Sequence, residues 1–83
     1  MSEETNIIAK IGVDTDPPAK EPIFISLSSY MNKKYLDIRK YYKDTSDEFK
    51  PTKKGIAMTM AQLKDFMKSI DENMANIENW FNS

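Results

Sequence analysis

Residues 23–42 read IFISLSSYMNKKYLDIRKYY, and this stretch contains the pattern that decides the fold. Apolar and polar side chains alternate along residues 23–30, which predicts a strand with one buried face. Residues 31–33 are short and polar, and Asn32 suits a turn. Residues 34–42 are rich in Tyr, Leu and Ile, as expected for the returning strand of a hairpin. We therefore predict an antiparallel β-hairpin.

The alternation also predicts which face of the hairpin is buried. Ile23, Ile25 and Leu27 share one face, which Leu36 and Ile38 join, and we expect this face to be the core. The opposite face carries Phe24, Ser26, Ser28, Tyr30, Tyr35, Asp37 and Arg39.

Strict alternation places Lys40 and Tyr42 on the core side of the hairpin. Because a lysine is poorly suited to a core, we expect a bulge near Lys40 that turns the end of the strand over. Tyr42 would then face the same surface as Tyr30.

The sequence on either side of the hairpin predicts further elements. Residues 7–12 are consistent with a short strand, so the sheet has three or four strands, and residues 13–22 form a proline-rich connection. After the hairpin we expect a loop over residues 43–54 and a short apolar strand over residues 55–58.

A helix is expected after this last strand. Residues 59–62, Thr-Met-Ala-Gln, have the spacing of a capping box, which places the first helical residue at Met60. Apolar side chains then recur near the helical period, and no Gly or Pro interrupts them before Ser83. These apolar residues are Leu63, Phe66, Met67, Ile70, Met74, Ile77, Trp80 and Phe81. One long helix over a small antiparallel sheet is an α+β fold.

Composition limits how such a small chain is stabilised. Its 83 residues bury a limited core, and the absence of Cys and His excludes disulfides and argues against a zinc site. Small domains without these supports often self-associate. We therefore predict a homodimer that uses neither a metal nor another cofactor. The expected dimer interface is Leu63, Phe66, Ile70, Met74 and Ile77.

The same composition argues against catalysis and against a membrane protein. Without His, Cys or a glycine-rich phosphate loop, the chain lacks the commonest general base, the strongest nucleophile and the usual phosphate cradle. No apolar run is long enough to cross a bilayer, and no signal-peptide pattern opens the chain. We expect a soluble, intracellular protein that is not an enzyme.

Positive charge is concentrated in one segment. Residues 33–55 hold eight basic, four acidic and four aromatic residues, a net charge of +4, whereas the whole chain has a net charge of −1. Cations follow phosphates and exposed bases stack on aromatic rings, so this composition favours single-stranded nucleic acid. For the charge alone, a solvated basic face is the plainer alternative.

The residues of this segment resemble the C-terminal domain of the eukaryotic transcriptional coactivator family called positive cofactor four. The family pattern has a strand ending in an aromatic residue, a basic turn, a strand of the form L-x-D-I-R-x-Y-aromatic, an acidic loop, and K-P-x-x-K-G-I-x-L before a helix. Here Tyr30 ends the first strand and Lys33 follows it, residues 36–42 read LDIRKYY, and residues 50–58 read KPTKKGIAM.

The resemblance implies a homodimer in which each subunit has a strongly curved antiparallel sheet and a long helix, with two channels for single-stranded or unwound DNA. It divides the chain into an N-terminal segment, residues 1–22, and a DNA-binding domain, residues 23–83. The DNA contacts of the family correspond to Tyr30, Lys33, Arg39, Tyr42, Lys50 and Lys54. Together with Lys53 in the same basic segment, these residues are the expected DNA-binding set.

The chain departs from the family pattern at several positions. Tyr42 stands where Trp is frequent, Met31 stands where Lys is common, and Glu21 and Ile23 stand where the family has basic residues. We therefore expect weaker DNA binding than the family pattern alone implies. The serine- and acid-rich regulatory tail of the animal proteins is missing, so control by phosphorylation need not carry over.

Alternatives are open at this point for residues and for function. Arg39 pairs either with a phosphate or with Asp37, while Tyr35 and Tyr41 are expected to pack rather than to stack on bases. The protein acts on DNA in transcription, replication or repair; the alternatives are a module that docks acidic activation segments or polymerase components, and an RNA-binding module. The expected location is the nucleus for a eukaryotic source, and otherwise DNA in a bacterial or viral relative.

Overall fold

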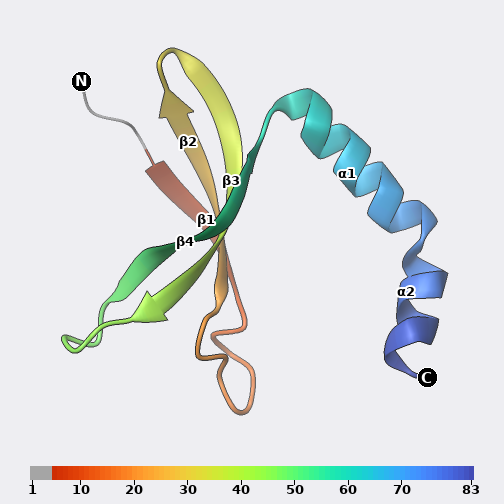
Figure 1. The fold of residues 1–83 in the computed structure, drawn as a ribbon, viewed down its shortest axis with the longest axis horizontal. Helices are drawn as coiled ribbons and strands as arrows, with labels where there is room; N and C mark the ends of the chain where they lie inside the picture. Colours follow the sequence, from red (N-terminus) through yellow and green to blue (C-terminus); the bar gives the residue numbers. More distant parts are fainter. Residues whose placement is uncertain (1–4) are drawn as a thin grey trace.

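The computed structural model describes residues 5–83 as four strands followed by two helices (Figure 1). The elements are β1 (Thr5–Ile11), β2 (Ile23–Tyr30), β3 (Lys33–Lys43), β4 (Phe49–Met58), α1 (Met60–Glu72) and α2 (Met74–Phe81). The strands form one antiparallel sheet in the order β1-β2-β3-β4. The short strand expected at residues 7–12 therefore corresponds to β1, which ends one residue earlier at Ile11, and the sheet has four strands.

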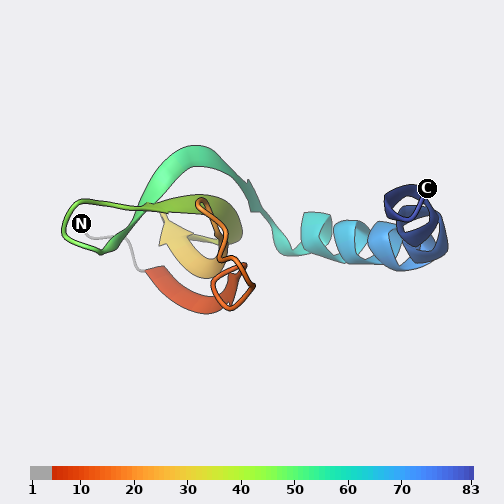
Figure 2. The same cartoon turned by 90° about the horizontal axis from the view of Figure 1, so that it is seen from below.

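The sheet curves strongly (Figure 2), and Phe24 of β2 is buried on one side of it. Its ring stacks on Tyr41 of β3 at a centroid distance of 4.2 Å and meets Phe49 of β4 edge-on at 5.2 Å. The ammonium group of Lys10 on β1 lies 5.5 Å from the same ring. Side chains from all four strands thus converge on one ring, which requires the sheet to bend toward it. We call this side, with Phe24, Ser26, Asp37, Arg39 and Tyr41, the inner face.

The prediction of the buried face was wrong for a single chain. Phe24 and Ser26, assigned to the polar side, are each only 1 % exposed, whereas Leu27 on the expected core side is 47 % exposed. The reason is tertiary, because the curvature closes the inner face, whereas only the start of α1 covers part of the other one. The apolar residues of this outer face are Ile25, Leu27, Leu36, Ile38, Ile56 and Met58.

The irregularity expected near Lys40 is present, but it does not turn the strand over. Arg39 pairs with Gly55 and Tyr41 pairs with Pro51, so the extra residues are on β4. β3 keeps its alternation, with Tyr41 buried and Tyr42 exposed. Tyr42 therefore stays on the opposite side of the strand from Tyr41, contrary to the prediction.

The expected loop over residues 43–54 is also shorter in the structure. β3 continues to Lys43 and β4 begins at Phe49, with Pro51 inside the strand. Proline is tolerated there because β4 is an edge strand and the ladder is already interrupted beside it.

The capping box is confirmed. The Gln62 backbone N–H donates to Thr59 Oγ1 at 3.3 Å, and the Thr59 N–H donates to Gln62 Oε1 at 3.0 Å. These reciprocal bonds satisfy two amide groups at the start of α1.

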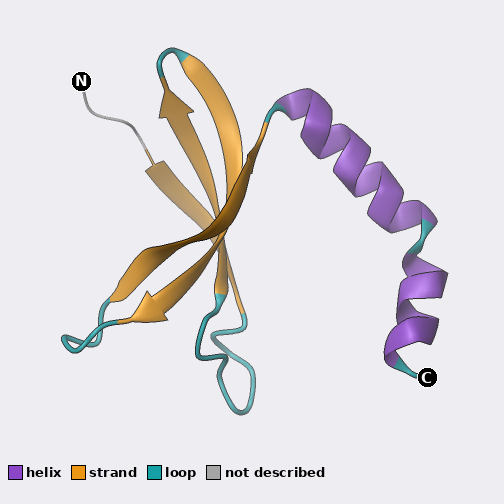
Figure 3. Cartoon of the chain, viewed as in Figure 1, coloured by secondary structure: helices purple, strands orange, loops and turns teal. Residues whose placement is uncertain are grey.

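One long helix was predicted, whereas the structure has two helical segments that meet at Asn73 (Figure 3). The Asn73 side-chain amide donates to the Ser69 carbonyl oxygen at 2.8 Å, and its backbone N–H is shared between Ser69 O and Ile70 O. A polar side chain that takes a helical carbonyl competes with the regular ladder. One uninterrupted helix was expected because the segment contains no Gly or Pro, but a side-chain hydrogen bond from Asn73 also interrupts it.

The helices project away from the sheet instead of lying over it (Figures 1 and 2). Neither helix contains a buried residue, and only the start of α1 approaches β3 and β4. The radius of gyration is 15.0 Å, compared with about 12 Å for a compact chain of this length. The single chain is thus an open shape with apolar surface on both its sheet and its helices.

Candidate nucleic-acid interface

The turn between β2 and β3 places an aromatic ring beside a lysine. Met31 and Asn32 have φ values of 51° and 65°, as a tight two-residue hairpin turn requires. Tyr30 and Lys33 pair directly across this turn, so their side chains leave the same face of the sheet. Tyr30 is 53 % exposed, and Lys33 is also exposed. An exposed ring can stack on a base, and the neighbouring ammonium group can bind the phosphate of the same nucleotide.

Arg39 lies in the middle of β3 and is held by three hydrogen bonds. Its Nε and Nη2 donate to the two carboxylate oxygens of Asp37, each at 3.0 Å, and its Nη1 donates to the Thr52 carbonyl oxygen at 3.0 Å. The hydrogen bond to Asp37 raises the pKa of Arg39 above its ordinary value. The Asp37 pair considered from the sequence is therefore present. An arginine has five N–H donors, so two are left for another acceptor.

The remaining basic residues of the expected set differ in whether an acidic side chain lies near them. They are Lys50, Lys53 and Lys54, all on β4. The ammonium group of Lys50 is 3.5 Å from Glu48 and 4.0 Å from Asp44, and that of Lys54 is 3.4 Å from Glu21. Exposed pairs of this kind contribute little stability, so a phosphate can compete for these lysines. Within residues 5–83, neither Lys33 nor Lys53 has an acidic partner, and both are exposed.

Asp44 shapes the turn that joins β3 to β4 beside Lys50. Its carboxylate accepts the backbone N–H groups of Ser46 at 2.9 Å and Glu48 at 3.0 Å. Asp47 takes a φ of 68°, which closes the turn. The acidic loop expected from the sequence is thus a folded turn that fixes where β4 begins.

The structure distributes the expected set over strands β2, β3 and β4 rather than in one cluster. Tyr30 and Lys33 lie at one end of β3, Arg39 lies in the middle, and Tyr42 pairs with Lys50 near the other end. The strand from residue 33 to residue 42 spans at most about 30 Å. By register, Tyr30, Lys33 and Arg39 share the inner face, whereas Tyr42 and its partner Lys50 leave the opposite face, so the structure does not bring the whole expected set onto one face of the sheet.

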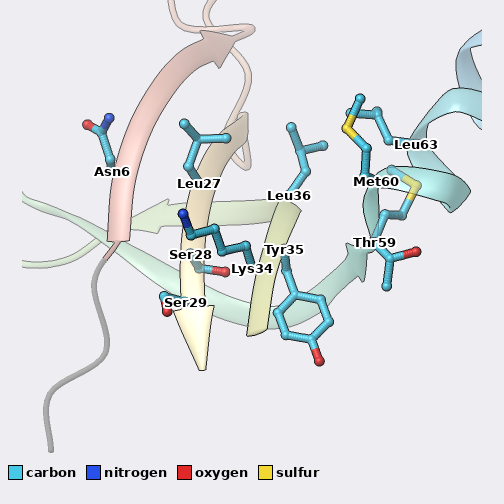
Figure 4. Close-up of a pocket in the computed structure, with 11 residues that line it drawn as sticks. Asn6, Leu27, Ser28, Ser29, Lys34, Tyr35, Leu36, Thr59, Met60 and Leu63 are labelled. Carbon is cyan, nitrogen blue, oxygen red and sulfur yellow. The ribbon is translucent and has the colours of Figure 1, made fainter. Parts of the chain in front are cut away.

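The two remaining tyrosines of the hairpin are packing residues to different degrees. Tyr41 is 8 % exposed and stacked on Phe24, so its expected packing role is confirmed. Tyr35 is half-buried and contributes to an apolar groove between the sheet and the start of α1 (Figure 4).

Residues 18–69 match the family model described as Transcriptional Coactivator p15 (PC4). The chain belongs to this family. The match confirms the resemblance seen in the hairpin residues, and it indicates a DNA-associated protein with a role in transcription. No significant match to a solved structure was found.

The p15 family match covers the expected DNA-binding residues but not the whole structure. All seven residues of the expected DNA-binding set lie inside it, whereas β1, most of the connection to β2, and α2 lie outside it. Two exposed lysines outside the expected set, Lys20 and Lys40, lie on a groove at the Tyr42 end of β3. The sequence contained a sign only for Lys40, because strict alternation placed this lysine on the expected core side, where a charged residue is unfavourable.

Across residues 5–83, no group of three or more acidic residues is placed to hold a metal ion. No described helix is long and apolar enough to cross a membrane.

Proposed function

We propose that this protein binds single-stranded or unwound DNA without sequence preference, as a homodimer, and acts as a transcription coactivator or as an accessory protein of replication or repair. The observation that carries the proposal is the pairing of the open Tyr30 ring with Lys33 at the β2–β3 turn, in a sheet whose edge strand β4 also carries exposed Lys50, Lys53 and Lys54. Rings supply stacking that any base accepts, and lysines supply a phosphate attraction that requires no sequence.

Arg39 fits this proposal as a fixed rather than a mobile cation. The carboxylate of Asp37 and the carbonyl of Thr52 hold the guanidinium in one orientation. A held cation loses little side-chain entropy when it binds a phosphate, although the neighbouring carboxylate opposes the approach of the anion.

The homodimer part of the proposal rests on unpartnered apolar surface. Phe66, Ile70 and Met74 are 44 %, 37 % and 43 % exposed, and Leu63 and Ile77 are half-buried. Between the start of α1 and the outer face lies a groove of about 650 Å³, in which Leu27 and Leu36 face Met60 and Leu63 (Figure 4). Monomeric soluble proteins rarely expose contiguous apolar surface of this kind. A second copy can cover the outer face and the helix stripe together.

The experiment that tests DNA binding is a titration with matched single strands of DNA and RNA. Lys50→Ala and Lys53→Ala should each weaken DNA binding for all sequences alike and should reduce the slope of log K against log salt by about 0.7 per lost phosphate contact. Lys64→Ala on α1 is the matched control and should behave like the parent protein.

Other outcomes of this titration would favour the other functions. Tighter binding of the RNA strand than of the DNA strand would favour the RNA-binding module. A parent protein that ignores both strands but binds an acidic peptide with little dependence on salt would favour the protein-docking module.

A further inference from the structure

A groove lies beyond the Tyr42 end of the hairpin, where the connection between β1 and β2 folds against the ends of β3 and β4. It has a volume of about 970 Å³. The connection contributes one wall through Val13, Pro18 and Lys20, and β3 contributes the other through Lys40 and Tyr42. Pockets of about 300–1,000 Å³ accommodate drug-sized ligands, so one nucleotide fits.

The wall made by the connection is held in shape by its own hydrogen bonds. The Ala19 N–H donates to the Gly12 carbonyl oxygen at 2.9 Å, and Thr15 Oγ1 donates to the same oxygen at 3.0 Å. Gly12 has a φ of +97°, which other residues rarely adopt. At its far end the connection is fastened to β3, because the Tyr41 N–H donates to Pro22 O at 2.9 Å. The groove is therefore formed before any ligand arrives.

The groove carries positive charge that the protein does not neutralise. Lys20 and Lys40 are exposed, and neither has an acidic partner within residues 5–83. The one acidic residue among those lining the groove, Glu21, is engaged by Lys54 at 3.4 Å. Two ammonium groups without acidic partners, one on each wall of a preformed groove, favour a ligand with phosphate groups.

An aromatic surface is available in the same groove. Tyr42 is 43 % exposed, and its place on the side of β3 opposite the buried Tyr41 directs it away from the inner face. Neighbouring Lys40 leaves β3 on the same side as Tyr42, because side chains two residues apart share a face. A ring and a cation on one side of a strand match the base and the phosphate of one nucleotide.

We propose that this groove is a further phosphate subsite for single-stranded DNA, in which Lys20 and Lys40 bind the phosphates that follow the base stacked on Tyr42. The subsite rests on the DNA binding proposed above and extends it, because the groove continues from the Tyr42–Lys50 end of the hairpin. Lys20 and Lys40 are not among the residues that correspond to family contacts. Of the residues that the connection contributes to the wall, Val13 lies outside the family match, whereas Pro18 and Lys20 lie inside it.

The extended path predicts a dependence on strand length. A short strand is satisfied by the hairpin alone, whereas a longer strand also reaches the groove and gains its contacts. Lys20 and Lys40 should therefore matter only for the longer strands. A uniform basic surface would instead make every lysine matter at every length.

The test is a titration of the full chain with an oligothymidylate length series. The Lys20→Ala/Lys40→Ala double variant is compared with the Lys64→Ala control. We expect the parent protein and the control to gain affinity above a threshold length, and the double variant to lose that gain, about tenfold, with its salt slope smaller by about 1.4. For strands below the threshold, the three proteins should bind equally. Unchanged thermal melting would establish that the double variant is folded.

The length series distinguishes a failure of the proposed subsite from a failure of the proposed DNA binding as a whole. If the parent protein binds every oligomer but the double variant follows it at all lengths, the subsite is overturned and the hairpin site stands. If the parent protein binds no oligomer at any length, the proposed DNA binding falls and the subsite falls with it. A double variant that loses affinity equally at all lengths would also overturn the subsite, since it would place both lysines on the primary path.

Discussion

Arg39 lies directly over Gly55, its cross-strand partner on β4. A Cβ atom at residue 55 would come within 2.8 Å of Arg39 Cζ and 2.9 Å of Arg39 Cβ. Arg39 Cβ is bonded directly to the backbone, so it cannot move away unless strand β3 moves. A side chain at residue 55 would therefore require the backbone to shift, and not only the Arg39 side chain. The absence of a side chain at Gly55 is what allows Arg39 to reach both Asp37 and the Thr52 carbonyl.

Gly55→Ala should therefore destabilise the domain. We expect a loss of about 1–3 kcal/mol in the free energy of unfolding, typical of an overpacked site, measured by chemical denaturation. Ala57→Ser, two residues along the same strand, is the matched control and should change the stability by less. Equal stability of Gly55→Ala and the parent protein would show that Arg39 does not occupy this position.

Asp37→Asn should separate the structural and the binding roles of Arg39. The change removes the charged partner of a part-buried guanidinium, so unfolding should become easier by about 1–2 kcal/mol. If Arg39 also binds a phosphate, single-strand affinity should rise a few-fold, because the opposing carboxylate charge is gone. A fall in affinity together with the fall in stability would mean that the pair serves only to shape the site.

The tyrosines of the hairpin should divide into two classes by exposure. Tyr30→Ala and Tyr42→Ala should each weaken single-strand binding about tenfold, since a stacked base contributes about 1–3 kcal/mol. Melting temperatures should barely change, because both rings are largely exposed. Filter binding and calorimetry measure the two effects separately.

Tyr41→Ala is the counterpart of these variants. Its ring is buried against Phe24, so we expect it to cost about 3 kcal/mol of stability or more. Loss of binding in a fully stable Tyr41→Ala protein would contradict this assignment of the rings.

Ile70→Asp tests the proposed dimer. In a single chain the Ile70 side chain is 37 % exposed on the part of α1 that projects away from the sheet, so an aspartate there should be tolerated by an isolated protomer. In a dimer that covers the stripe, an unpaired buried charge should dissociate or unfold the assembly. Light scattering should give twice the chain mass of 9.6 kDa for the parent protein and for a Lys68→Asp control. A folded parent protein that elutes as a single chain would refute the dimer.

Local features were predictable from the sequence because local chemistry determines them. The hairpin needs only alternation and a two-residue turn, and the start of α1 needs only the Thr59–Gln62 spacing. The irregularity was predicted at the right position beside Lys40 but for a reason that the structure does not support, because β3 keeps its alternation there and the extra residues are on β4.

Features that depend on contacts between distant residues were not predictable in the same way. Alternation shows that two faces differ but does not say toward which one the sheet curves, so Phe24 was placed on the wrong side. The break at Asn73 depends on one side chain finding the Ser69 carbonyl. Lys20 joins Lys40 and Tyr42 only because the connection folds back on Gly12, and no motif encodes that closure.

The central claim is that the hairpin binds single strands by stacking together with phosphate attraction. The most direct measurement compares the affinity for an oligothymidylate strand with that for a duplex of equal length over a series of salt concentrations. The account predicts tighter binding of the single strand at every salt concentration, with a slope of about −3.5 if Lys33, Arg39, Lys50, Lys53 and Lys54 each neutralise one phosphate. Equal affinity for strand and duplex would contradict it, because paired bases cannot stack on Tyr30 and the surface would then be only a basic patch.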